Sequence, residues 1–77
     1  MFRELECVVL TTDIPDNGLR KSDVGTVVHA YPEGRAFIVE FLALDGSTAA
    51  VTEVLPSQIR SVTASDITHA RTIEVQA

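Results

Sequence analysis

Aromatic side chains are scarce in this sequence: its 77 residues include three Phe, one Tyr and no Trp. A chain of this length forms one small domain, which buries roughly 60% of the surface that its unfolded form exposes. Its thin core therefore has to be built from aliphatic side chains. Valine is stiff at χ1 and favours pleated strands over helices. The ten valines of the chain thus predict an all-β domain.

Cysteine is nearly absent as well. Cys7 is the only one, so the chain cannot form an internal disulfide, which excludes the disulfide-stapled secreted class. The sequence lacks a basic N-terminal region followed by an apolar run, and no apolar stretch approaches the roughly 20 residues that span a bilayer. We therefore expect a cytoplasmic protein without membrane contact. Because so small a core usually needs added support, we also expect a homo-oligomer.

Positive charge is in short supply, with 6 Lys and Arg against 11 Asp and Glu and a net charge of −5. This balance opposes binding to phosphate backbones, so a nucleic-acid partner is not expected. The acidic residues are spread along the chain, as in an ordinary solubility charge.

Five segments have the composition of short strands, and turn-forming residues separate them. They are residues 5–12, 24–31, 37–41, 47–54 and 61–62. Phe37 and Phe41 share one face of the third segment with Val39, which makes these two phenylalanines the leading core candidates. Gly25 predicts a bulge, a sharp bend or a close backbone approach in the second segment. Cys7, inside the first, is interpreted as a small core residue.

Turn chemistry suggests how these segments connect. Pro32–Arg35 suits a tight connection, and the Asp45-Gly46 dipeptide predicts a type I′ hairpin. Residues 55–60, interrupted by proline, are long enough for a single 3₁₀ turn. A long early loop, two hairpins and a 3₁₀ turn before the last strand predict a five-stranded SH3-like barrel over residues 1–62. The alternative is an open, strongly twisted five-stranded sheet.

Residues 63–77 form a C-terminal extension that two patterns describe differently. Ser65-Asp66 could cap a short helix through Ala70, whereas residues 72–75 alternate as in a sixth strand. The extension contains three apolar side chains whose burial would be favourable: Ile67, Ile73 and Val75. The extension is therefore predicted either to pair with a neighbouring subunit or to fray.

A resemblance to a known family rests on several segments in fixed order. They are Leu5-Glu6-Cys7-Val8-Val9-Leu10-Thr11, Asp13-Ile14-Pro15, Gly18-Leu19, Asp23-Val24-Gly25-Thr26-Val27-Val28, Val39-Glu40-Phe41 and Asp45-Gly46. Over about Glu4 to Val62 the chain resembles the bacterial domain of unknown function 4926, which implies a small, often stand-alone protein without an established activity. The chain departs from the expected pattern at Ser22, where glycine is expected, which bears on that turn.

A more distant resemblance is carried by Gly25-Thr26-Val27-Val28, where a glycine opens a strand that leads into a hairpin. This stretch is similar to the KOW-type segment of ribosomal and transcription-elongation proteins, a likeness that implies binding of RNA or protein. The scarcity of cations opposes the RNA interpretation.

No arrangement of residues indicates an enzyme. Cys7, His29 and His69 lack the close spacing of structural zinc motifs, so neither a metal site nor a cofactor is expected. The loop aspartates are interpreted as turn residues: Asp13, Asp16, Asp23 and Asp45. The chain has no glycine-rich phosphate loop and no serine-centred elbow.

Candidate partner-binding residues therefore come from a loop, a strand end and the tail. In SH3-like barrels the loop corresponding to residues 13–23 borders the groove used for partners, and Tyr31 offers a rigid amphipathic contact, although covering one end of the barrel is its plainer role. The candidates are Asp13, Asp16, Asn17, Tyr31, Ile73 and Val75.

From these features we expect a non-enzymatic protein-interaction module that self-associates, of a regulatory or antitoxin-like kind, with a further protein partner encoded nearby. Two alternatives stay open. One is a KOW-type nucleic-acid-associated module, and the other is an accessory subunit with a site shared between chains.

Overall fold

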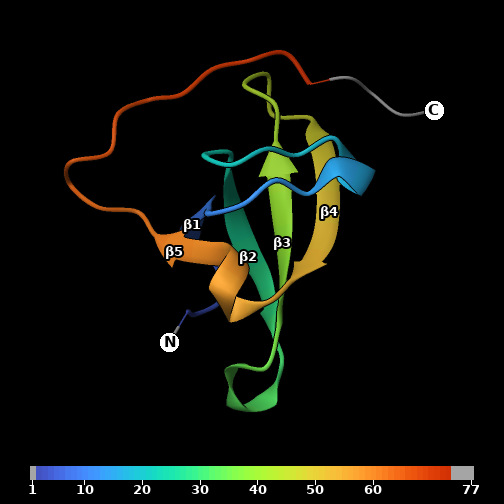
Figure 1. Ribbon diagram of the computed structural model, residues 1–77, viewed down its shortest axis with the longest axis vertical. Coiled ribbons are helices and arrows are strands. Elements are labelled where there is room, and N and C mark those ends of the chain that lie inside the picture. Colours follow the sequence, from blue (N-terminus) through green and yellow to red (C-terminus); the bar gives the residue numbers. More distant parts are fainter. Residues whose placement is uncertain (1, 74–77) are drawn as a thin grey trace.

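The computed structural model describes residues 2–73, in which every regular element is a strand or a single 3₁₀ turn. Five strands form one antiparallel sheet in the order β4-β3-β2-β1-β5 (Figure 1). They are β1 (Cys7–Leu10), β2 (Val24–Ala30), β3 (Phe37–Leu42), β4 (Thr48–Val54) and β5 (Ile59–Ser61). The 3₁₀ turns are η1 (Pro15–Asn17), η2 (Pro32–Gly34) and η3 (Pro56–Gln58). The predicted all-β, five-stranded domain with a 3₁₀ turn before its last strand is confirmed.

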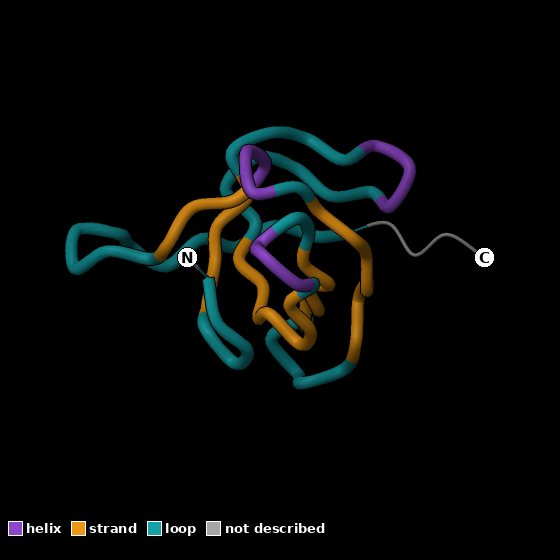
Figure 2. The backbone as a smooth tube through the Cα atoms, turned by 90° about the horizontal axis from the view of Figure 1, so that it is seen from below, coloured by secondary structure: helices purple, strands orange, loops and turns teal. Residues whose placement is uncertain are grey.

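The sheet has the connectivity of an SH3-like barrel. Strands β1 to β4 pair consecutively as a meander, and β5 returns through η3 to pair with the free side of β1. Figure 2, seen from below, shows the strands bending round one another. Because β4 and β5 stand at the two ends of the strand order, the barrel is only partly closed.

The core fills the concave side of this sheet. It consists of Val8, Leu10, Leu19, Val27, Phe37, Val39, Phe41, Val54 and Ile59. Phe37 and Phe41 are both buried, which confirms the alternation predicted for β3. Phe2 packs edge-on against Phe37 with ring centroids 5.3 Å apart, so the N-terminal residues close one side of the core.

Gly25 allows β2 to approach β3 closely. A Cβ atom at this position would lie 2.5 Å from Val39 Cγ1 and 2.9 Å from both the Glu40 carbonyl oxygen and Phe41 Cδ2. Of the three roles predicted for this glycine, close approach is the one observed. The register shift of this strand pair falls elsewhere, between Val27 and His29.

Two predictions about the first strand are wrong. The strand begins at Cys7 and not at Leu5, whose φ of 71° takes it out of the extended region and leaves its side chain exposed. Cys7 itself is exposed. Because Val8 and Leu10 occupy the core side of β1, alternation turns Cys7 outward. Val9 also faces outward but is buried, so both faces of β1 are covered around Val9.

The hairpin between β3 and β4 forms where predicted, but it is not of type I′. Gly46 has a φ of 89°, whereas Asp45 does not have positive φ. The Ala43 carbonyl accepts from the Gly46 N–H at 2.9 Å, and the Ala43 N–H donates to the Ser47 carbonyl at 2.8 Å. These bonds describe a three-residue loop that ends in a glycine bulge. The Asp45 carboxylate accepts from the N–H and hydroxyl of Ser47, which stabilises this alternative turn.

The fifth strand comes earlier than the predicted 61–62, and residues 62–73 contain neither helix nor strand. The predicted helix through Ala70 is therefore not formed. Asp66 instead closes a turn: its carboxylate accepts from the Thr63 N–H at 2.7 Å, and its own N–H donates to the Thr63 carbonyl at 3.1 Å. Beyond this turn the chain swings wide of the barrel and returns across one end (Figure 1). The alternative sixth strand includes Val75, which lies outside the described residues.

Candidate functional site

The loop between β1 and β2 ends in a turn that positions Asp23. The Asp23 N–H donates to the Arg20 carbonyl at 3.0 Å, and the Asp23 carboxylate accepts from the Arg20 N–H at 2.8 Å. Ser22, where glycine is expected, has a φ of 81°, so the turn does require a left-handed residue. Asp23 is 8% exposed and is the one charged residue buried in the described part of the chain.

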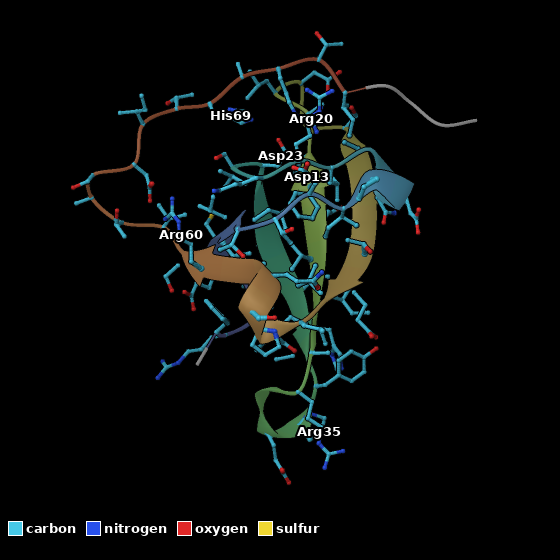
Figure 3. The ribbon with its side chains drawn as sticks, in the orientation of Figure 1. Asp13, Arg20, Asp23, Arg35, Arg60 and His69 are labelled. Atoms are coloured by element: carbon cyan, nitrogen blue, oxygen red, sulfur yellow. The ribbon has the colours of Figure 1, made fainter. Side chains whose placement is uncertain are left out.

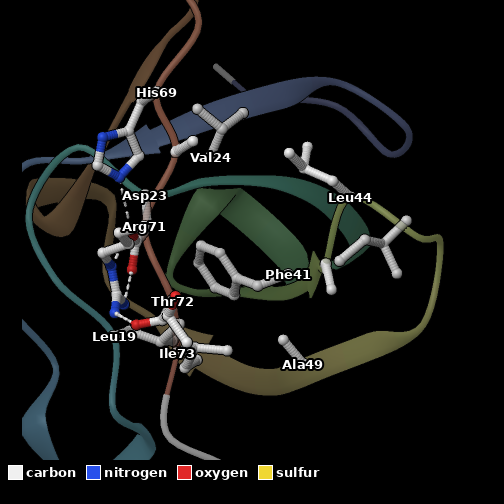
Figure 4. Close-up of a pocket in the computed structure, with 13 residues that line it drawn as sticks. Leu19, Asp23, Val24, Phe41, Leu44, Ala49, His69, Arg71, Thr72 and Ile73 are labelled. Carbon is white, nitrogen blue, oxygen red and sulfur yellow. Dashed lines mark hydrogen bonds and ion pairs between the residues drawn. The ribbon is translucent and has the colours of Figure 1, made fainter.

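Residues 62–73, called here the C-terminal segment, return to this turn and bind it. Arg71 Nε donates to Asp23 Oδ1 at 2.8 Å, and Arg71 Nη2 donates to Asp23 Oδ2. The same Nη2 donates to the Gly18 carbonyl at 2.8 Å. His69 Nε2 lies 3.1 Å from Asp23 Oδ1. We call these four residues the Asp23 network, and Figure 4 shows Asp23, His69 and Arg71 at one end of a groove.

Electrostatics favour the ionised form of the network. Burial alone raises the pKa of the Asp23 carboxyl, but hydrogen bonds from Arg71, the Arg20 N–H and His69 outweigh it and hold this pKa below its usual value. The hydrogen bond to Asp23 in turn raises the pKa of Arg71. Two parallel bonds from a guanidinium to a carboxylate are the geometry that arginine provides and lysine does not. Asp23 is therefore positioned to bind an arginine side chain.

Beside the network lies an open groove of about 400 Å³, between the C-terminal segment and the β3–β4 hairpin. Its lining is mainly apolar and includes Leu19, Val24, Phe41, Leu44, Ala49 and Ile73 (Figure 4). Ile73 packs against the core, whereas Leu44 at the hairpin tip is exposed. The C-terminal segment thus forms one wall of this groove, with Arg71 at its charged end and Ile73 on its apolar lining.

The candidate residues of the early loop lie near this site without joining the network. The Asp13 carboxylate accepts from the Lys21 N–H at 2.8 Å, and Asp13 lines a neighbouring groove of about 360 Å³ together with Arg71. Asp16 and Asn17 belong to η1 on the same loop, and Asp16 is exposed. The loop aspartate Asp13 thus has the turn role predicted for it.

The other candidates are divided between two ends of the barrel. Ile73 lines the main groove, and Val75 lies outside the described residues. Tyr31 follows the last residue of β2, at the opposite end from the early loop, so it does not form one site with that loop. Its ring packs edge-on against His29, with centroids 4.9 Å apart, and a hydrogen bond to Glu53 raises the pKa of its phenol.

Sequence analysis missed the central contact of the site. Asp23 was assigned to turn formation, which its bond to the Arg20 N–H bears out, but its arginine partner lies 48 residues further along the chain. The only signal in the sequence is a cation next to apolar residues in the tail, at Arg71-Thr72-Ile73. Such a signal does not identify which of the acidic residues it meets.

The cations do not gather on one surface. Figure 3 shows Arg35 at the η2 end, Arg60 beside β5 and Arg20 at the opposite end from Arg35. Arg60 pairs with Asp66 at 2.8 Å, and Arg71 pairs with Asp23.

Two features are absent from residues 2–73, a cluster of metal ligands and a membrane-spanning helix. Within that range no group of three or more His, Cys, Asp or Glu side chains is arranged to hold a metal ion. Nor does the same range contain a helix with the length and hydropathy needed to cross a membrane.

Comparison with known proteins gives one match. The family model for Domain of unknown function (DUF4926) matches residues 4–61. No curated protein and no solved structure matches the chain. The matched range runs from the N-terminal residues to the end of β5, so it contains Asp23 but ends before His69, Arg71 and Ile73.

Proposed function

The chain belongs to the DUF4926 family, whose function is unknown, and we propose that it is a non-enzymatic protein-interaction module that self-associates by exchanging its C-terminal segment between two copies. In the exchanged dimer, His69 and Arg71 of one copy contact Asp23 of the other, and Ile73 lines the groove of that other copy. The single cysteine favours a cytoplasmic location for this module.

The observation that carries this proposal is the way in which the C-terminal segment binds. Its recognition is concentrated in residues 69–73, through the arginine fork on Asp23, the bond to the Gly18 carbonyl and the packing of Ile73. None of these contacts depends on the covalent connection between the segment and the barrel. A second copy can therefore supply the same side chains, which is the basis of domain exchange in symmetric dimers.

The connection to the barrel supports exchange for a second reason. Every residue from 61 to 70 is exposed, and Ile67 is 90% exposed. Figure 1 shows this stretch standing away from the strands. Opening it therefore costs little buried surface. In an exchanged dimer the two connecting stretches come together and shield both copies of Ile67 from water, and a thin core gains support from association.

The turn at Thr63–Asp66 sets the point beyond which the C-terminal segment can leave its own barrel. Arg60 donates to the Asp66 carboxylate at 3.0 Å through Nη1 and at 2.8 Å through Nη2, which keeps the turn beside its own β5. The hinge then consists of Ile67 and Thr68. Short hinges of this kind favour exchange over closure on the same barrel.

Light scattering on the full chain tests self-association, and paramagnetic broadening tests exchange. A nitroxide is attached at Thr72→Cys in an unlabelled Cys7→Ser chain, which is mixed with isotope-labelled wild-type chain. Exchange predicts a dimer mass and broadening of the Gly18, Asp23 and Phe41 amides in the labelled copy. A nitroxide at Glu33→Cys, at the η2 end, is the matched control and leaves those amides sharp.

Two results would contradict the proposal. A monomer mass at millimolar concentration would exclude self-association. A dimer in which the Thr72 nitroxide leaves the groove amides of the labelled copy unchanged would exclude exchange, and the dimer would then form through another surface.

A further inference from the structure

The convex side of β2, β3 and β4 faces away from the core, and aliphatic side chains on it remain in solvent. Val24, Val28, Leu42 and Val51 are each between 41% and 51% exposed, and half-buried Ile38 lies among them. We call this side of the three strands the outer face. Figure 1 shows the three strands side by side. Aliphatic groups on adjacent strands of one face form a continuous patch, which marks an interaction surface.

Acidic side chains alternate with the aliphatic ones on this face. The strand register pairs Glu40 with Val51 and Ile38 with Glu53, so these two aliphatic residues each have a carboxylate beside them on the next strand, whereas Leu42 pairs with Thr48. The Glu40 carboxylate accepts from the Thr48 hydroxyl at 2.8 Å, which holds it on the surface of the sheet. The three strands contain neither lysine nor arginine.

This charge pattern decides which partner the outer face suits. Covering the aliphatic patch also removes Glu40 and Glu53 from water, which is costly unless positive charge meets them. A second copy would bring its own two carboxylates to the same place. The outer face is therefore unsuited to self-association and calls for a partner that carries lysine or arginine beside aliphatic residues.

We propose that the outer face binds an amphipathic helix of a partner protein, with an aliphatic stripe flanked by lysine and arginine. The width of the face fits this occupant. Strands β2 and β4 are two strand spacings apart, roughly 10 Å, and an α-helix with its side chains is about 10–12 Å across. One helix thus covers the three strands, packs its stripe on Leu42 and Val51 and brings its cations to Glu40 and Glu53.

Tyr31 borders the outer face at the η2 end. Its ring packs edge-on on His29, which pairs with Ile38 in the neighbouring strand. Packed aromatic side chains of this kind are favourable contacts at interfaces. Tyr31 therefore contributes to this face and not to the groove at the other end of the barrel.

The test uses the full chain, isotope-labelled, and two synthetic helical peptides of about 18 residues. Both peptides have leucine along one stripe, and the remaining positions are lysine in one peptide and glutamate in the other. The proposal predicts that the lysine peptide shifts the amides of β2, β3 and β4 and that the glutamate peptide does not bind. Added salt weakens the binding, because it screens the exposed charges.

Matched substitutions locate the binding. Val51→Lys removes aliphatic contact and adds repulsion at a position that does not line the groove, so it weakens binding of the lysine peptide by about tenfold or more. Leu55→Lys introduces the same charge at an aliphatic side chain that is equally exposed, 52% against 51%, but lies outside the outer face, and it leaves the affinity unchanged.

The charge requirement has a matched control as well. The pair Glu40→Gln and Glu53→Gln weakens binding, whereas the pair Asp16→Asn and Glu33→Gln removes the same number of charges elsewhere and has no such effect. Equal binding of the glutamate peptide, equal effects of the Val51 and Leu55 variants, or shifts confined to the groove would each overturn the proposal. These outcomes leave segment exchange untouched, because Glu40, Val51 and Glu53 do not line the groove.

Discussion

The barrel and the C-terminal segment are built differently. Nine core side chains are almost fully buried by residues distant in sequence, whereas residues 61–70 are all exposed. One arginine fork, one histidine contact, a bond to the Gly18 carbonyl and the packing of Ile73 hold the segment to the barrel. The barrel therefore depends on apolar burial and the segment on a few directional, charged contacts.

The two regions should therefore respond to different substitutions and to different solution conditions. Apolar burial is spread over many contacts and responds to changes of side-chain volume. A buried ion pair depends on one geometry and on the protonation of one carboxylate. Substitutions in the core should thus act on the whole domain, and substitutions in the Asp23 network should act on the segment alone.

The largest effect is expected from Phe37→Ala. Phe37 is fully buried and carries the edge-on contact with Phe2, and truncation of a buried phenylalanine costs about 3–5 kcal/mol. Small domains have a free energy of unfolding of only about 5 kcal/mol at the lower end of the usual range. The variant should therefore be largely unfolded by circular dichroism. A cooperative urea transition close to that of the wild type would show that the core does not hold the barrel together.

Gly25→Ala should rank next. The added methyl would overlap Val39 and Phe41, and overpacking of this kind costs about 1–3 kcal/mol. Gly46→Ala is the matched control, because no atom lies within 4 Å of its Cβ position and only its φ of 89° opposes the change. Urea denaturation should give the larger loss for Gly25→Ala. A larger loss for Gly46→Ala would mean that the close approach of β2 to β3 contributes less to the free energy of unfolding than the geometry of the hairpin does.

Asp23→Asn should separate the two regions most clearly. The substitution removes the charge that Arg71 meets, and hydrogen bonds to charged groups contribute about 1.5–3 kcal/mol. We expect lower backbone order parameters at residues 69–73 and little change at β2 and β3. Asp13→Asn, which alters a loop aspartate outside the network, should leave the segment ordered. Equal loosening of the strands would show that the segment and barrel unfold together.

The smallest effect concerns pH. The folded-state pKa of Asp23 lies below its usual value of 3.8, so the carboxylate stabilises the fold fully above that value, and this contribution is lost as the pH falls through the lowered folded-state pKa. Amide shifts of residues 69–73 should therefore move below about pH 4, and Asp23→Asn should abolish that transition. Persistence of the acid transition in Asp23→Asn would assign it to another group.

The local features of the barrel could be predicted from neighbouring residues. Alternation in β3 identified Phe37 and Phe41 as core residues, and proline identified the 3₁₀ turn at η3. The hairpin at Asp45-Gly46 was located correctly but given the wrong turn type, because Ser47 donates to Asp45 and stabilises a longer loop. Cys7 was misplaced because both faces of β1 carry apolar residues, so alternation alone could not orient the strand.

The sequence by itself determined the all-β class, the order of the strands and the places where the chain turns, because these depend on side-chain period and on backbone preferences within a few residues. Only the tertiary structure decided that Arg71 meets Asp23, that Tyr31 stands apart from the early loop and that Leu42 and Val51 share one exposed face. Each of these depends on strand register and on the return of the C-terminal segment. Such long-range geometry is set by how the whole sheet curls, and no local pattern encodes it.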